Sequence, residues 1–90
     1  MKIQKWQALA TEAIIARRGE QDAVHHLLKL MEEVGELAEA HNHSFSLEET
    51  GDEAADVLFA LVVYCQTMGI DLEEARERKF AKLQKRWGHG

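Results

Sequence analysis

The sequence predicts an all-α fold in which four helices form a bundle that is completed by oligomerisation. Three observations predict it. The 90 residues contain no proline. Apolar side chains recur at the three- and four-residue spacing of helices rather than alternating as in strands. The connections between the apolar stretches are short, which favours antiparallel neighbouring helices. With no linker or repeat, residues 1–90 are expected to form a single domain.

The first two helices are predicted from their apolar stripes. Residues 3–18 have one apolar face, and Gly19 follows as a helix end. Residues 22–40 carry a longer stripe along one side of a second helix, and residues 41–45 are expected to form a loop. The stripe of this second helix comprises Val24, Leu27, Leu28, Met31, Val34, Leu37 and Ala38.

The third and fourth helices are predicted from their ends. A third helix is expected over residues 46–68, because Ser46 and Glu49 have the spacing of a capping box, in which each side chain covers a free backbone N–H. Gly69 then provides a natural stop. The fourth helix is expected over residues 71–87, with its first residue, an aspartate, as the N-cap.

The third helix indicates oligomerisation. Between Ala54 and Cys65 the one charged residue is Asp56, and apolar side chains cover the whole circumference. A helix that is apolar all round has to be buried all round. Because a short chain buries a limited fraction of its surface, we expect a second copy to cover one side, in a homodimer or homotetramer. The alternative is a central helix wrapped by its own three neighbours.

Composition excludes several classes of partner. The formal net charge of −5 argues against non-specific binding to nucleic acid polymers. No segment has the pattern of a signal peptide, and the longest apolar stretch is shorter than the about 20 residues that a membrane span needs. The single cysteine, Cys65, cannot form an internal disulfide. We therefore expect a soluble, cytoplasmic protein.

Acidic residues gather in the middle of the chain. Exposed helix faces usually mix charges, because opposite charges three or four residues apart stabilise a helix. Here a long segment has no lysine or arginine, which indicates that a cation from outside compensates its charge. The acidic residues of this segment are Glu32, Glu33, Glu36, Glu39, Glu48, Glu49, Asp52, Glu53 and Asp56.

Two pairs of these carboxylates have the same spacing. Glu33 and Glu36 share one helix face, and Glu53 and Asp56 repeat that spacing on the third helix. If the two helices pack antiparallel, the four carboxylates converge, and without a cation some of them would stay protonated. Carboxylate oxygens favour Mg²⁺, with Mn²⁺ as a substitute, over zinc.

Asp56 is the most informative of the four, because its helix is otherwise apolar. A buried carboxylate without a partner costs several kcal/mol, and metal ligation would explain it. The alternatives are a buried pair with a lysine or arginine of another helix, or an exposed place at the edge of the bundle. Gly35, between two proposed ligands, either lets a ligand or backbone approach closely or packs tightly against another helix.

These residues resemble the paired motif of the MazG-like nucleotide pyrophosphohydrolases, an all-helical superfamily. The motif is Glu-Glu-x-x-Glu, a spacer, and Glu-x-x-Asp. In this chain it is Glu32-Glu33-Val34-Gly35-Glu36, followed by Glu53-Ala54-Ala55-Asp56. The likeness covers most of the chain and includes the ending Lys79-Phe80-Ala81-Lys82.

The resemblance implies a Mg²⁺-dependent hydrolase that cleaves a nucleoside triphosphate between the α and β phosphates, giving a monophosphate and pyrophosphate. By motif position it implies Glu33, Glu36, Glu53 and Asp56 as metal ligands. Glu32 would hold a second metal or position the attacking water. The catalytic residues would be Glu32, Glu33 and Glu36.

Substrate contacts are expected outside the paired motif. Lys79 and Arg86 match family positions and are expected to contact phosphate, although the dipole of the last helix also explains basic residues near its end. Trp6 would stack on the base, or else lie in the core or an interface. Two asparagines common among relatives are replaced by Val63 and Leu83, so the resemblance leaves the base and sugar open.

The other ionisable side chains suggest no further site. Lys29 lies four residues before Glu33, which predicts an intrahelical ion pair. His25 and His26 are expected at the surface. The two histidines of the 41–45 loop offer too few convergent ligands for a zinc site.

The leading function is therefore hydrolysis of a ribo- or deoxyribonucleoside triphosphate, including non-standard ones. Two alternatives stay open. One is hydrolysis of phosphoribosyl-ATP, and the other is a helical dimer that binds a metal or a partner without catalysis. A di-iron carboxylate bundle is set aside because it requires Glu-x-x-His motifs, which the sequence lacks.

Overall fold

The structure, a computed structural model, describes residues 2–88. It contains four helices: α1 (Ile3–Arg18), α2 (Ala23–Asn42), α3 (Leu47–Met68) and α4 (Leu72–Trp87). The all-α class and the four predicted helices are confirmed. The one notable difference is that α2 continues through Asn42, so the predicted 41–45 loop begins only at His43.

The helix ends follow from local sequence. The Asp22 carboxylate accepts a hydrogen bond from the N–H of His25 and caps α2. Ser46 and Glu49 form the predicted capping box at the start of α3, with both hydrogen bonds at 3.1 Å. Gly69 ends α3 with a φ of 74°, a left-handed conformation that glycine adopts without strain.

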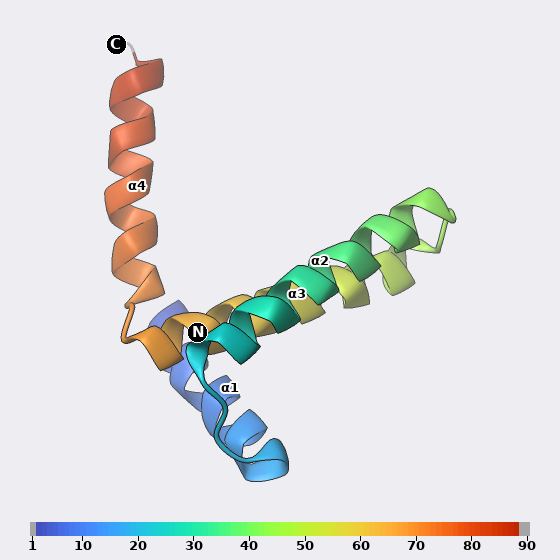
Figure 1. Cartoon of the computed structure of the whole chain (residues 1–90). Coiled ribbons are helices and arrows are strands. Elements are labelled where there is room, and N and C mark those ends of the chain that lie inside the picture. Colours follow the sequence, from blue (N-terminus) through green and yellow to red (C-terminus); the bar gives the residue numbers. More distant parts are fainter. Residues whose placement is uncertain (1, 89–90) are drawn as a thin grey trace.

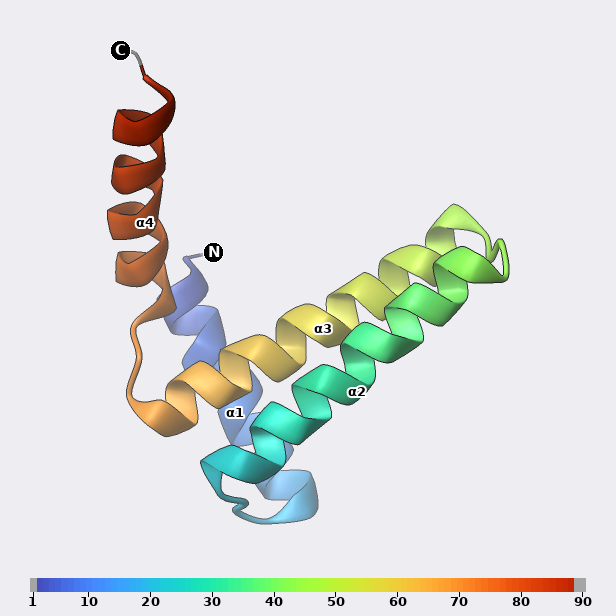
Figure 2. The same ribbon diagram turned by 45° about the horizontal axis from the view of Figure 1, so that its top comes forward.

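The helices do not close into a four-helix bundle within one chain. α2 and α3 pair as a long antiparallel hairpin, and α1 crosses the end of α3 that lies away from the hairpin tip (Figures 1 and 2). α4 turns away by 104° relative to α3 and projects from the rest of the molecule. Its main neighbour is α1, which it meets where the N–H of Ile3 donates to the Glu73 carboxylate at 3.1 Å. One chain therefore packs three helices together and leaves the fourth, α4, outside a closed bundle.

The core lies where α1 crosses α3. It is built on Ala10, Val62 and Val63, with partly buried residues packed around them: Ile3, Trp6, Ile14 and Leu72. The Trp6 ring packs at a tilt on Phe59, with the ring centroids 4.8 Å apart. Trp6 therefore has the core position that was the alternative to stacking on a base.

Gln7, which the sequence did not single out, joins α1 to the turn between α3 and α4. It is 2% exposed. Its side-chain amide donates to the carbonyl of Ile70 at 2.6 Å and to the side chain of Gln66 at 3.3 Å, and its oxygen accepts from the N–H of Leu72. The buried side chain of Gln7 thus forms hydrogen bonds with two backbone groups of the turn that have no partner within a helix.

We expect Gln7→Leu to lower the free energy of unfolding by about 1–3 kcal/mol, because it leaves the Ile70 carbonyl and the Leu72 N–H without their partner. Urea denaturation followed by circular dichroism measures the change. The matched control is Gln4→Leu on the exposed side of α1, which should shift stability by less than about 0.5 kcal/mol. Equal effects of the two substitutions would contradict the role of Gln7.

A broad apolar surface remains exposed on the α2–α3 hairpin. Met31 is 64% exposed and Leu28 is 59% exposed on α2, and Leu58 and Phe59 on α3 are more than two-fifths exposed. α3 is therefore not wrapped by its own three neighbours, because α4 leaves it uncovered. Within the described residues, no individual helix has both the length and the apolar character to cross a membrane.

Candidate metal centre

The pairing of α2 with α3 brings the predicted carboxylates together. Oxygens of Glu33, Glu53 and Asp56 lie within 4.8 Å of one another, and so do oxygens of Glu32, Glu33 and Glu36. Glu33 belongs to both sets and is their centre. The antiparallel packing on which the prediction depended is present, so the four proposed ligands and Glu32 form one acidic cluster along the hairpin.

The five carboxylates differ in burial. Glu33 is 7% exposed, and Glu53 is half-buried, whereas Glu32, Glu36 and Asp56 are exposed in the single chain. The expectation that Asp56 is buried among apolar side chains is therefore wrong for one chain. Asp56 has the edge position that was one of its alternatives, because the apolar residues around it on α3 are exposed as well.

Two carboxylate oxygens in this cluster are buried without a hydrogen-bond partner, Oε2 of Glu33 and Oε2 of Glu53. The Lys29 ammonium reaches only the other oxygen of Glu33, at 3.2 Å. A buried anionic oxygen with no partner is costly. A hard divalent cation that takes several oxygen ligands would satisfy both atoms, so the residues fit the metal that the motif implies.

Repulsion within the cluster is visible at Glu36. The charge on Glu33 raises the pKa of the Glu36 carboxyl above its ordinary value, with further contributions from desolvation and from the charges on Glu53 and Glu32. A raised pKa means that the folded chain disfavours the ionised form. A bound cation would remove this repulsion.

In the metal-free protein, we expect Glu36→Gln to raise the unfolding temperature at neutral pH. The pKa of Glu36 lies above its ordinary 4.5 in the folded chain, so the folded chain binds more protons than the unfolded chain in that range. Stability therefore falls as the pH rises from 4.5 through the raised pKa. Glutamine carries no charge, so the difference in unfolding temperature between the variant and the wild type should vanish at pH values below that range.

Scanning calorimetry in EDTA at a series of pH values measures this difference. Saturating Mg²⁺ should reverse the order, because the wild-type chain gains the free energy of metal binding and the variant has lost a ligand. A variant less stable than the wild type in EDTA at neutral pH would contradict the proposed repulsion.

Lys29 forms the ion pair predicted for it. Its ammonium lies 3.2 Å from Glu33 and 3.5 Å from Glu32. The hydrogen bond to Glu33 is the main reason that the pKa of Lys29 is raised. The side chain is two-fifths exposed, so this pair contributes little to stability, but it leaves Lys29 occupied.

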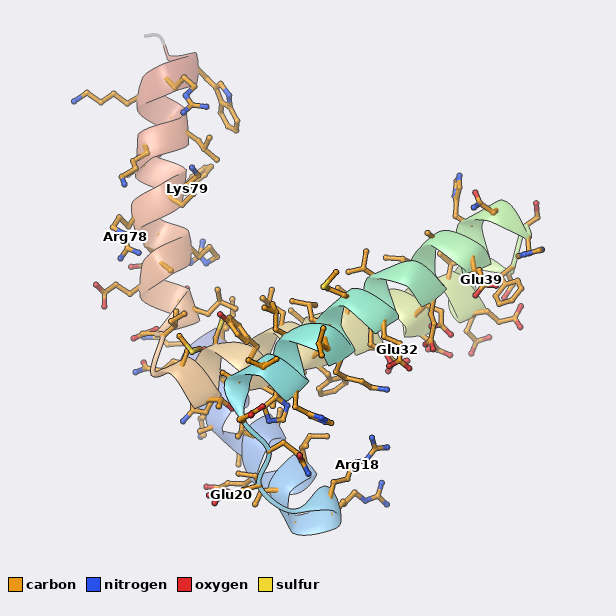
Figure 3. The ribbon with its side chains drawn as sticks, viewed as in Figure 1. Arg18, Glu20, Glu32, Glu39, Arg78 and Lys79 are labelled. Atoms are coloured by element: carbon orange, nitrogen blue, oxygen red, sulfur yellow. The ribbon has the colours of Figure 1, made fainter. Side chains whose placement is uncertain are left out.

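A groove that the sequence did not predict adjoins the acidic cluster. It has a volume of about 570 Å³ and lies between the end of α1 and the α2–α3 hairpin. Glu33 and Asp56 line it, together with Arg17, Arg18 and Lys29. Figure 3 shows Arg18 at the end of α1 and Glu32 on α2 both projecting into the open angle between these elements. Basic residues in the last turn of a helix were the available signal, but spacing alone does not show what they face.

Several other predicted residues lie away from this groove. Lys79 projects from α4, which points away from the hairpin, and Arg86 is in the last turn of the same helix (Figure 3). Within one chain, neither reaches the acidic cluster. Gly35 is exposed, and a Cβ there would meet no atom within 4 Å, so the close approach expected at Gly35 is not made by this chain.

The expectation that His25 and His26 both lie at the surface is confirmed for His25 and wrong for His26. His25 is exposed, but His26 is 7% exposed and lies between α2 and its neighbours. Burial lowers the pKa of His26, and the neighbouring His25 lowers it further. The reason is packing: His26 is on the side of α2 that faces α1 and α3, where it lines the groove beside Val63.

Comparisons with known proteins agree with the motif. A sequence model of the MazG nucleotide pyrophosphohydrolase domain matches residues 21–90. An uncharacterized protein of Bacillus subtilis (strain 168), YpjD, is similar to the chain at 38% identity, with 67% of this chain and 62% of that protein covered. The chain thus spans about three-fifths of that relative's length. No solved structure matches the chain.

The matched region begins just before α2 and includes both acidic motifs and all of α3 and α4. Of these elements, α2 and α3 build the carboxylate cluster, so the comparison and the geometry point to the same part of the chain. The chain belongs to the MazG nucleotide pyrophosphohydrolase family.

Proposed function

We propose that this chain is a Mg²⁺-dependent nucleoside triphosphate pyrophosphohydrolase, which cleaves between the α and β phosphates to give a monophosphate and pyrophosphate. The observation that supports it most is the pair of buried, unpartnered oxygens of Glu33 and Glu53 inside a carboxylate cluster. Family membership supports the reaction class. The substrates are ribo- or deoxyribonucleoside triphosphates, including non-standard ones.

Four side chains of the cluster would hold the cation: Glu33, Glu36, Glu53 and Asp56. Mn²⁺ would substitute, because it accepts the same oxygen ligands. When bound, the ion supplies positive charge that offsets the acidic surface, polarises a phosphoryl oxygen and lowers the pKa of bound water. Without that charge the cluster would repel a triphosphate.

Glu32 would act on the attacking water. Its carboxylate is exposed and lies within the cluster, where Lys29 approaches it at 3.5 Å. An ionised carboxylate in that place can accept a hydrogen bond from water and take its proton. The water oxygen then bonds to the α phosphorus, the bridging oxygen leaves with pyrophosphate, and no covalent intermediate on the protein is needed.

A homodimer or homotetramer is part of the proposal. Several large apolar side chains of α2 and α3 are exposed along the hairpin, and extended exposed apolar patches mark interaction sites. A second copy would cover it and complete the bundle that α4 leaves open. Lys79 and Arg86 could contact phosphate only in such an assembly, in the site of another copy.

A nucleotide panel tests the function. Purified protein is incubated with Mg²⁺ and standard triphosphates, modified triphosphates or phosphoribosyl-ATP, and the phosphate products are separated. The expected result is monophosphate and pyrophosphate in equal amounts, abolished by EDTA. Orthophosphate as the first product would contradict α–β cleavage. Turnover of phosphoribosyl-ATP alone would favour that alternative, and no turnover at all would favour the non-catalytic one.

A further inference from the structure

Opposite charges line the groove beside the acidic cluster without pairing across it. Glu33 of α2 and Asp56 of α3 lie in its lining, and Arg17 and Arg18 come from the end of α1. Among the described residues, neither arginine forms an ion pair, although Lys29 pairs with its helical neighbours. Unpaired arginines and carboxylates that border the same space leave room for a ligand between them.

The placement of the two arginines is not explained by their helix alone. Basic residues in the last turn of α1 are favourable to the helix dipole, but the dipole does not orient them. Successive helical side chains diverge by about 100°, yet both Arg17 and Arg18 line this groove. The groove therefore borders a broad face of α1 that carries Ala13, Ile14, Arg17 and Arg18. Its volume of about 570 Å³ is within the usual range for small-molecule sites.

The order of charges suits one class of ligand. A metal-complexed triphosphate carries a cation at the point of reaction and dense negative charge beyond it. The carboxylates that α2 and α3 contribute to the lining suit the cation, and the guanidinium groups of α1 suit the phosphates, because their planar fork binds phosphate oxygens in a bidentate manner. Lys29 is occupied by Glu32 and Glu33, so within one chain the arginines are the donors in this groove that are available for phosphate.

We infer that Arg17 and Arg18 bind the β and γ phosphates of the substrate and hold the pyrophosphate that leaves. This inference rests on the proposed function. From the α phosphorus at the acidic cluster, the substrate extends in two directions, toward the sugar and base or toward the β and γ phosphates. The uncharged sugar and base would gain little from two guanidinium groups. The anionic β and γ phosphates would gain charge-assisted hydrogen bonds from them.

The test compares two double variants of α1. Arg17→Gln with Arg18→Gln removes the proposed contacts. Lys2→Gln with Lys5→Gln removes the same charge from exposed positions at the opposite end of the helix and is the control. Titration calorimetry in Mg²⁺ measures binding of pyrophosphate and of nucleoside monophosphate to each protein. Circular dichroism verifies that each variant is folded. A third variant, Arg17→Lys with Arg18→Lys, keeps the positive charges but loses the planar guanidinium groups.

The arginine-to-glutamine variant should bind pyrophosphate about tenfold to a hundredfold more weakly, with monophosphate binding nearly unchanged. The lysine variant should fall between it and the wild type, and KM for the triphosphate should rise more than kcat falls. Equal pyrophosphate binding by the glutamine variant and the control would overturn the inference. So would an equal loss of monophosphate binding, or no pyrophosphate binding by the wild type.

Calorimetry separates this inference from the proposed function, because it needs no turnover. A wild type that binds pyrophosphate through the arginines but hydrolyses no nucleotide would contradict the function and support the anion site. A wild type that hydrolyses nucleotide with the same KM and pyrophosphate affinity as the glutamine variant would support the function and overturn the anion site.

Discussion

Glu33→Gln is expected to reduce nucleotide turnover by more than about a hundredfold, which is the upper end of the loss seen when a group that merely orients a metal ligand is changed. Glu33 belongs to both carboxylate sets and is the most buried of the five acids. The amide has the same shape but neither the charge nor the second oxygen that a cation needs. Pyrophosphate release at saturating Mg²⁺ measures the loss.

The matched control is Glu39→Gln. It makes the same chemical change on the same helix, but Glu39 is exposed, belongs to neither carboxylate set and lies nearer the hairpin tip (Figure 3). Its turnover should remain within about twofold of the wild type, since surface changes away from a site have small effects. Asp56→Asn should behave like Glu33→Gln. If Glu33→Gln and Asp56→Asn hydrolysed nucleotide as fast as the Glu39→Gln control, the cluster would not be the active site.

Leu28→Glu combined with Met31→Glu is expected to convert the proposed oligomer into monomers. Both side chains are about three-fifths exposed on the α2 stripe of the single chain and lie outside its buried core. In a symmetric assembly each substitution occurs in both copies, and each places a charge in an apolar interface, which costs several kcal/mol. Light scattering coupled to size exclusion measures the mass.

The control for this variant is Gln4→Glu, which adds negative charge at an exposed polar position on α1. It should leave the assembly unchanged. Circular dichroism should show the same helix content in all proteins, because the altered residues do not contribute to the core of one chain. A wild-type protein that is monomeric at high concentration would contradict the proposal, as would a double variant that keeps the wild-type mass.

Local signals predicted the helices well. The end of α1 follows from Gly19, the two ends of α3 from the Ser46 capping box and Gly69, and the start of α4 from the Asp71 cap, all of which act within a few residues of the chain. The end of α2 was predicted too early, at Ala40, because His41 and Asn42 carry no stop signal and the helix continues through them. Such signals could not predict whether the four helices of one chain close into a bundle, since this depends on the angle between α3 and α4.

The candidate site also has a part that local sequence predicts and a part that depends on how the helices pack. Carboxylates spaced three apart on two antiparallel helices converge by geometry alone, so the cluster around Glu33 was predictable. The burial of His26, the bridging role of Gln7 and the groove face of Arg17 depend on how α1 crosses the hairpin. An apolar circumference also indicates that α3 has to be covered, without saying by which chain, and for that reason Asp56, expected to be buried, is exposed in the single chain.

Titration of the metal-free protein with Mn²⁺, followed by the electron paramagnetic resonance signal of the free ion, tests the central claim most directly. The wild type should bind Mn²⁺ saturably, and Mg²⁺ should compete. Glu33→Gln combined with Glu53→Gln, which removes the negative charge and one oxygen from each of the two side chains with a buried unpartnered oxygen, should weaken binding by at least about tenfold. Absence of binding by the wild type, or equal binding by the two proteins, would contradict a metal centre in this cluster.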